Sequence, residues 1–320
     1  VQRHFPAGEL DHLRIRGAVR VIQRRAAHAA IIAPNETCKA TRLELTLGVT
    51  LAVLGAALLH AAWNAIIKSG RDPLLDTALV ALGGTVVASP LLFAFGPPEA
   101  ASWPFIAASV CVHIGYYATL AGAYRAGDLS HGYPIMRGSA PLLVALAAST
   151  VFGEALSPGG WCGVVLICAG VLSLGLAGGG ASGRATIWAL ANAAIIAIYT
   201  LVDGTGVRAS GGAERYIVWL FFFMGLPFGL IVLALRRGEF LHHAARHWWR
   251  GVAGAALSGL SYGIALWAMT RAPVAVVAAL RETSVIFGAL IGVWLLKEGH
   301  LGPRLAGAAT VLAGVIALKL

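Results

Sequence analysis

The sequence predicts an all-α membrane protein with ten transmembrane helices, arranged as two inverted repeats of five helices each. Three observations predict this fold: the low share of charged residues, the regular succession of long apolar segments, and an internal repeat. Of the 320 residues, 58% are hydrophobic and only 12% are charged, whereas a soluble domain has about 25% charged residues. So little charge cannot cover the surface of a soluble globule of this size. A soluble cytosolic enzyme is therefore excluded.

Long apolar segments follow one another from residue 45 onward, separated by short breaks rich in Gly, Pro and charge. A helix needs about 20 apolar residues to cross the hydrocarbon core of a bilayer. An even number of crossings places both termini on the same side of the membrane. We predict ten spans, at residues 45–67, 74–95, 104–124, 130–152, 158–177, 185–203, 216–235, 251–270, 273–296 and 302–319.

Residues 1–44 differ from the rest of the chain because they are rich in Arg and contain no apolar stretch long enough to span a membrane. They also lack the apolar region and small-residue cleavage site of a secretory signal peptide. We interpret this segment as a disordered basic tail or a misassigned start. Most of the other basic residues stand singly between apolar segments, where positive charge marks the sidedness of loops. The net charge of +10 is therefore no sign of a nucleic-acid partner.

An internal repeat appears when the sequence is shifted by 144 residues, which aligns 137–174 with 281–318. Identical positions include the pair Arg137 and Arg281, inside apolar segments, and the pair Glu154 and Glu298, just after them. Charged residues are rare in such segments, so their match in register is hard to obtain by chance. The shift covers five predicted spans, an odd number, so the second copy must enter the membrane from the opposite side. Inverted repeats of this kind are typical of secondary transporters.

The sequence resembles the EamA-type members of the drug/metabolite transporter superfamily over residues 45–320. The resemblance rests on the two five-helix repeats and on a Glu after the fourth helix of each, followed by a glycine-rich fifth helix: Gly153-Glu154 before Gly163 and Gly170, and Glu298 before Gly307 and Gly314. It implies EamA-like repeats at 45–177 and 185–319, cytoplasmic termini and a transport function. One departure is that Ala155 and Gly299 stand where the family usually has a basic residue.

Three charged residues lie well inside predicted spans, away from the span ends: Arg137, Arg281 and Glu282. A charge at the middle of a bilayer costs about 2.5–3.5 kcal/mol on insertion scales, so each should face a cavity or a partner. The arginines could bind an anion or dipole in the transport pathway, or serve as structural locks bonded to carbonyls or to Glu282. Glu282, whose counterpart is Gly138, could exchange protons during transport or form a static ion pair.

Polar and aromatic residues of other spans are candidates to line the substrate site. His60 and Asn64 share one helical face, with Trp63 beside them, although such residues also serve as hydrogen-bonding glue between membrane helices. The aromatic candidates, which could instead be interface anchors, are Tyr133, Tyr199, Tyr262 and Trp267. We expect His113 to be structural and Asp203 to be solvated at the mouth of its span.

No metal or cofactor is expected. His242, His243 and His247 lie in the longest gap between spans, and we interpret them as part of a solvated interfacial loop rather than a metal site. The sequence shows no P-loop and no GxGxxG motif, so ATP hydrolysis by this chain is not expected.

We therefore predict a secondary transporter of a small organic metabolite or drug, working by alternating access, with proton coupling as a further option. The partners expected are the substrate and the lipid bilayer, in a multi-pass protein of a bacterial plasma membrane, and a homodimer is compatible with the sequence. Two other classes stay open: an intramembrane enzyme acting on lipid-linked substrates, and a membrane sensor or subunit that does not transport.

Overall fold

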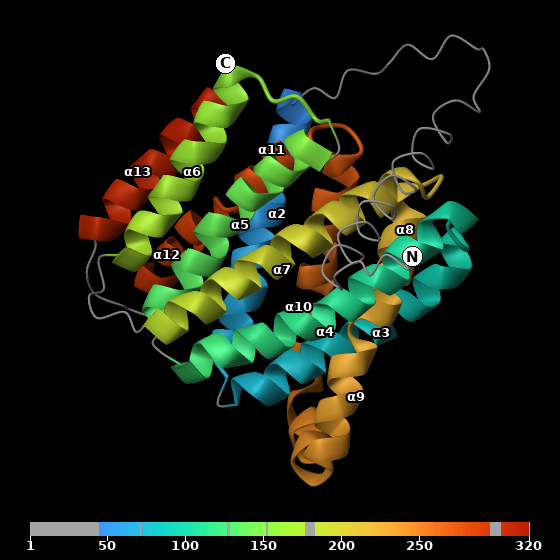
Figure 1. Cartoon of the computed structure of the whole chain (residues 1–320). Coiled ribbons are helices and arrows are strands. Elements are labelled where there is room, and N and C mark those ends of the chain that lie inside the picture. Colours follow the sequence, from blue (N-terminus) through green and yellow to red (C-terminus); the bar gives the residue numbers. More distant parts are fainter. Residues whose placement is uncertain are drawn as a thin grey trace, which may run out of the picture. The chain divides into compact units, whose positions relative to one another are not determined.

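The computed structural model describes residues 45–70, 72–126, 129–151, 153–176, 183–294 and 302–319, and these residues form helices and short connections with no β-strand (Figure 1). The basic segment 1–44 and Glu298 lie outside the described residues. The helices are α2 (Leu47–Lys68), α3 (Pro73–Phe95), α4 (Trp103–Ala126), α5 (Leu129–Val151), α6 (Pro158–Leu176), α7 (Gly183–Arg208), α8 (Ala213–Met224), α9 (Leu226–Leu235), α10 (Arg237–Met269), α11 (Val274–Arg281), α12 (Ser284–Trp294) and α13 (Gly302–Ala317), with a 3₁₀ turn, η1 (Ala100–Ser102).

Within the described ranges, six segments are long and apolar enough to cross a membrane, so the chain is an integral multi-pass membrane protein. Shorter apolar helices occur at Pro158–Ser173 and Ala306–Ala317. The six segments are Leu47–Ile67, Pro73–Phe95, Ala100–Leu120, Gly183–Arg208, Ala213–Leu235 and Arg237–Met269. The segment Ala213–Leu235 combines α8 and α9, which meet at Gly225.

The ends of these helices follow from local chemistry. The first N–H groups of a helix have no partner within the helix and need an acceptor from outside it. Asp72 supplies that acceptor for α3, because its Oδ1 accepts hydrogen bonds from the backbone N–H groups of Leu74 and Leu75 at 3.1 Å each. Pro73 follows as the first helical residue, where its missing N–H costs nothing. Thr46 caps α2 in the same way through Val49.

The internal repeat seen in the sequence is present in the helices. The shift of 144 residues carries α5 onto the combined length of α11 and α12, and α6 onto α13. Contacts between helices respect the same correspondence. Helix α2 packs on α10 and α12, just as its counterpart α7 packs on α4 and α5, and the two fifth helices, α6 and α13, pack on each other (Figure 1). Five helices in each copy fit an inverted repeat.

Helix α10 differs from the prediction. We expected the segment from Arg236 to Arg250 to be a solvated histidine-rich loop, but it is helical from Arg237 onward. The helix bends at His247, whose φ of −125° and ψ of 18° are not helical. The shift of 144 places His247 on Trp103, where α4 begins. Residues 237–246 are therefore a helical addition to the second repeat, which the first repeat lacks.

The contact between α6 and α13 depends on glycine. A Cβ added to Gly170 would lie 2.8 Å from the Gly307 carbonyl oxygen, and one added to Gly163 would lie 2.8 Å from that of Gly314. Cβ atoms do not approach backbone oxygens so closely, so only glycine allows the two helices to touch at these points. The 144-residue shift carries Gly163 to Gly307 and Gly170 to Gly314, so the internal repeat makes the two glycine contacts equivalent. The glycine-rich fifth helices therefore form a close contact between the repeats.

We predict that Gly170→Ala destabilises the protein. The added methyl group must push α6 away from α13, and overpacking of this kind typically costs about 1–3 kcal/mol. Thermal unfolding of the purified protein in detergent measures the loss. The matched control is Gly55→Ala, since Gly55 has no atom within 4 Å of the added Cβ and alanine is the better helix former. Equal melting temperatures for the two variants would contradict the prediction.

Candidate functional site

An ion pair joins the two repeats in the middle of the helix bundle. Arg137, in α5, places its Nε 2.9 Å from Oε2 of Glu282, which follows α11. Both residues are buried, with 7% and 3% of their surface exposed. The acid therefore pairs with the arginine of the other repeat rather than with its sequence neighbour Arg281. Of the alternatives open for Arg137, this geometry favours the structural lock bonded to Glu282.

The acid of this pair lies at a break between two helices. Helix α11 ends at Arg281 and α12 begins at Ser284. Backbone bonds across the break run from Glu282 N–H to the Ala279 carbonyl and from Thr283 N–H to the Leu280 carbonyl, the i to i+3 pattern of a 3₁₀ turn. The first repeat has no such break, since α5 continues through Pro134 and Pro141.

Polar atoms without hydrogen-bond partners gather at this break. Buried polar groups in native proteins are almost always paired, so each exception needs an explanation. Nε and the Nη2 atom of Arg137, Oε2 of Glu282 and Oγ of Ser284 are buried and lack a hydrogen bond; the 2.9 Å pair is thus a charge contact without hydrogen-bond geometry. These atoms keep hydrogen-bonding capacity that a bound molecule could use.

Packing explains why the first repeat has no acid at the equivalent position. Gly138 corresponds to Glu282, and a Cβ added there would lie 2.7 Å from Cγ and 3.1 Å from the backbone nitrogen of Leu172. Leu172 belongs to α6, which packs closely on α5. No side chain fits at residue 138, so only the second repeat provides an acid.

Arg281 lies differently from Arg137. It is buried, with 8% of its surface exposed, and its guanidinium carbon lies 4.8 Å from the centre of the Tyr262 ring. Among the described residues, none forms an ion pair or hydrogen bond with its side chain. The second arginine of the repeat is therefore a buried cation held by an aromatic face, a favourable but weaker contact than an ion pair.

Asp203 was expected at the mouth of its span, but it is completely buried, with 0% exposure. Helix α7 continues past it to Arg208. Its two carboxylate oxygens accept hydrogen bonds from the hydroxyl groups of Tyr216, at 2.9 Å, and Tyr262, at 2.6 Å. Tyr262 therefore connects this acid with Arg281. One signal for this role is present in the sequence: an aspartate four residues after Tyr199, inside an apolar run.

Aromatic rings surround Asp203 and Arg281. Tyr199 lies 4.4 Å from the ring of His113 and 6.2 Å from that of Tyr262, and Tyr116 lies at 6.1 Å on another side of it. His113 is buried, and its Nδ1 is 2.8 Å from the carbonyl oxygen of Ser109. His113, which we expected to be structural, thus packs within this group of aromatic rings.

The polar residues of α2 are satisfied mainly within their own helix. Trp63 Nε1 donates to Nδ1 of His60 at 3.3 Å, and Asn64 donates to the His60 carbonyl at 2.7 Å. The His60 side chain nevertheless lies near enough to Arg137 and Arg281 for their charges to act on it. Tyr133, half-buried in α5, lies within range of the same two arginines and of Glu282.

Trp267 is separated from this central cluster by its place near the end of α10. The guanidinium of Arg271 stacks over its ring at 4.2 Å. Both residues line an open depression of about 440 Å³, together with Arg208 and Glu214. Of the predicted site residues, Trp267 is the one that the structure places at the end of the bundle.

A polar network closes that end. Glu154 pairs with Arg208 at 2.5 Å and accepts a hydrogen bond from the backbone N–H of Val274, the first residue of α11, at 3.0 Å. Arg208 also donates to the carbonyl of Met269, the last residue of α10, at 2.8 Å. Gly153 has a φ of +66°, which glycine adopts without strain and which turns the chain towards this contact. The acid after the fourth helix therefore links the first repeat to the second.

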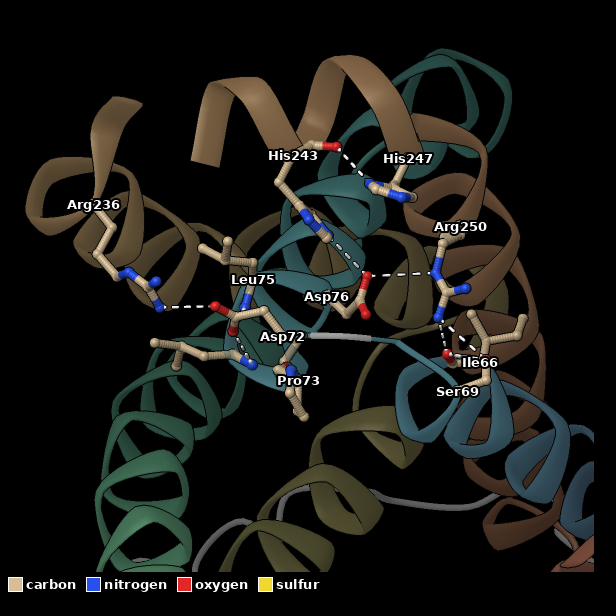
Figure 2. A network of polar contacts seen from close by, with 12 residues as sticks. Ile66, Ser69, Asp72, Pro73, Leu75, Asp76, Arg236, His243, His247 and Arg250 are labelled. Carbon is tan, nitrogen blue, oxygen red and sulfur yellow. Dashed lines mark hydrogen bonds and ion pairs between the residues drawn. The ribbon is translucent and has the colours of Figure 1, made fainter. Parts of the chain in front are cut away.

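A second network closes the opposite end of α10 (Figure 2). Asp76, with 2% of its surface exposed, lies in α3, and its Oδ1 is 3.0 Å from Nε2 of His243 and 3.5 Å from Nε of Arg250. Arg250 also donates to the carbonyl of Ile66 and the hydroxyl of Ser69, at the end of α2. His243 is thus a partly buried partner of Asp76 in a helix instead of a solvated loop residue. Among the described residues, no group of histidine, cysteine and acidic side chains is arranged to hold a metal.

Comparison with known proteins agrees with these features. The model of the EamA-like transporter family matches residues 46–176 and 183–320. A solved structure titled "Crystal structure of protein" superimposes with a TM-score of 0.67 at 21% sequence identity, covering 85% of this chain and 98% of that one. At this identity the similarity concerns the fold alone. No curated protein matches the sequence.

We predict that Arg137→Leu destabilises the protein strongly, because it leaves Glu282 as a buried charge without its partner. Breaking a buried ion pair from one side typically costs about 3–5 kcal/mol. The double variant Arg137→Leu/Glu282→Leu should recover most of the loss, and Arg281→Leu should cost less than Arg137→Leu. Melting temperatures of the three purified variants measure these effects. A double variant as unstable as Arg137→Leu would show that the loss does not come from an unpaired charge on Glu282.

We also predict that His243→Ala lowers stability by about 1–3 kcal/mol, the usual cost when a buried polar group loses its partner. Asp76 would then keep only Arg250. His242→Ala is the matched control, because His242 is the preceding residue of the same helix and is exposed. The comparison again uses thermal unfolding, and a loss of the same size in both variants would argue against a stabilising contact between His243 and Asp76.

Proposed function

The chain belongs to the EamA-like transporter family, and we propose that it transports a small organic molecule by alternating access between its two inverted repeats. The observation that supports this most is the broken helix at Arg281–Ser284, where the ion pair between Arg137 and Glu282 joins the repeats and the buried Ser284 hydroxyl has no hydrogen-bond partner. Secondary transporters commonly build their binding sites from discontinuous helices near the middle of the membrane, where two repeats meet. The substrate binds there in this proposal.

Alternating access requires contacts between the repeats that can break at one end while they hold at the other. Two such contacts exist: Glu154 with Arg208 at one end, and Asp76 with His243 and Arg250 at the other. Each joins a residue of the first repeat to one of the second, and α10 takes part in both with opposite ends. We propose that ten helical segments cross the membrane: α2, α3, α4, α5, α6, α7, α8 with α9, α10, α11 with α12, and α13. We propose further that these two networks open in turn.

Glu282 is our candidate for proton coupling. It is buried at the repeat interface, and its charge contact with Arg137 has no hydrogen-bond geometry, so a change in its protonation would alter the contact between the repeats. The remaining lining in this proposal consists of His60, Trp63, Asn64, Tyr133, Tyr199, Tyr262 and Arg281, with Trp267 at the mouth.

Counterflow in proteoliposomes tests the transport function. Vesicles loaded with a mixture of unlabelled small metabolites and drugs are diluted into single labelled solutes, and a transporter accumulates the label transiently by exchange. Vesicles without protein provide the background. An enzyme or a sensor need not exchange solute, so the absence of counterflow across a broad solute panel would count against the proposal.

For the coupling role, we predict that Glu282→Gln abolishes accumulation driven by a proton gradient but preserves counterflow. Glutamine keeps the size and hydrogen-bonding capacity of glutamate but cannot release a proton. Exchange needs only a loaded site that reorients, whereas accumulation also needs a return step with a different charge. Uptake with and without an imposed gradient measures both.

The matched control for this test is Glu214→Gln, the same substitution at an exposed acid, which should leave accumulation unchanged. Glu282→Gln protein of normal stability whose accumulation still follows the proton gradient would rule out the coupling role. Low yield and low stability of Glu282→Gln would instead show that the acid is a static partner of Arg137.

A further inference from the structure

We propose that Arg281 is the substrate's anchor and that the substrate is a small organic monoanion, a carboxylate with an apolar body. The inference rests on the transport function proposed above and specifies its substrate class. It starts from the unequal surroundings of the two buried arginines, which the sequence repeat presents as equivalent.

Arg137 already has an acid partner, whereas Arg281 does not. Glu282 lies 2.9 Å from Arg137. Arg281 lies within electrostatic range of the same acid but forms no ion pair or hydrogen bond with the described residues, and its guanidinium stacks on Tyr262 at 4.8 Å. Two nitrogens of Arg137 are fully buried, while no nitrogen of Arg281 is buried without a partner. Because the described residues form no hydrogen bond with those nitrogens, they are accessible at least to a water molecule, and in this proposal they face the substrate pathway. A planar guanidinium in such a place suits a carboxylate.

The helix break adds a second candidate hydrogen-bond donor, since Ser284 begins α12 three residues after Arg281. The Ser284 hydroxyl is buried, with 3% of the residue exposed, and has no hydrogen-bond partner. A carboxylate on Arg281 would give this hydroxyl an acceptor. The proposal thereby explains an unpartnered polar group that the protein alone does not satisfy.

The charges nearby favour a single negative charge on the substrate. Two of the four buried charges at the centre form the pair between Arg137 and Glu282, and Tyr262 links the other two, Arg281 and Asp203. Both oxygens of Asp203 are occupied by tyrosine hydroxyls, so this acid has no room for a cationic substrate. A dianion would bring more charge than one free guanidinium offers. The aromatic rings of Tyr199 and Tyr262 suit an apolar body.

Binding of matched probes to the purified full-length protein tests the proposal. Benzoate, benzamide, benzylamine and phenyl phosphate share a ring and differ in charge, and acetate and 3-phenylpropanoate vary the size of the carboxylate. The readout is the shift in melting temperature with probe concentration. We expect benzoate or 3-phenylpropanoate to stabilise the protein, and benzamide and benzylamine to have no effect. Arg281→Gln should weaken carboxylate binding about tenfold or more, the loss expected for a charged hydrogen bond.

Two variants keep this result specific. Arg215→Gln removes an exposed arginine outside the proposed site and should leave carboxylate binding unchanged. Arg281→Lys keeps the charge without the planar fork and should bind more weakly than the wild type but better than Arg281→Gln. If none of the three carboxylates stabilises the wild type, or if benzamide and benzoate act alike, the proposal is wrong.

The same measurements separate this inference from the transport function. Carboxylate binding that depends on Arg281, without counterflow of any solute, would support the anion site and refute transport. Counterflow of neutral or cationic solutes that persists in Arg281→Gln would support transport and overturn the anion site.

Discussion

The ion pair between Arg137 and Glu282 is the contact on which the arrangement of the two repeats depends. A charge in the middle of a bilayer costs about 2.5–3.5 kcal/mol on insertion scales, and each repeat contains such a charge without an internal partner. Folding one repeat on the other brings the two together at 2.9 Å. The glycine contacts between α6 and α13 then fix how closely the repeats approach. Each of these two repeats therefore contains a buried charge that is paired by a residue of the other repeat.

Most of the fold could be predicted because it follows from composition and spacing. Long apolar segments need no tertiary information to be recognised as helices, and a repeat shifted by an odd number of helices implies inversion. The errors in the predicted helices concern glycine and polar residues, which are common in loops but also occur inside helices. The predicted span ended at residue 203, but α7 continues to Arg208, and its Gly204 and Gly206 allow close contact with Val274 and Tyr216. The polar residues 237–250 suggested a loop, although one face of this helix is buried against α3.

The candidate site could be predicted only in part. Charged residues stand out in apolar segments, so Arg137, Arg281 and Glu282 were recognised from the sequence. Their pairing stayed one of several alternatives, because the sequence does not show which side chains of the two repeats come together. Asp203 was misjudged for a similar reason: its tyrosine donors lie on other helices, and only the folded chain shows that a carboxylate so deep in the protein is satisfied.

In the proposed transport cycle, Gly138 affects the relative energies of the inward-facing and outward-facing forms. If the two repeats were identical, exchanging their conformations would convert the inward-facing form into the outward-facing form at equal energy. Leu172 leaves no room for a side chain at residue 138, so the acid exists in one repeat only. The two facing directions then place the same charges in different surroundings. We expect the empty protein to rest mainly in one of them, with a preference in direction that the duplication itself did not provide.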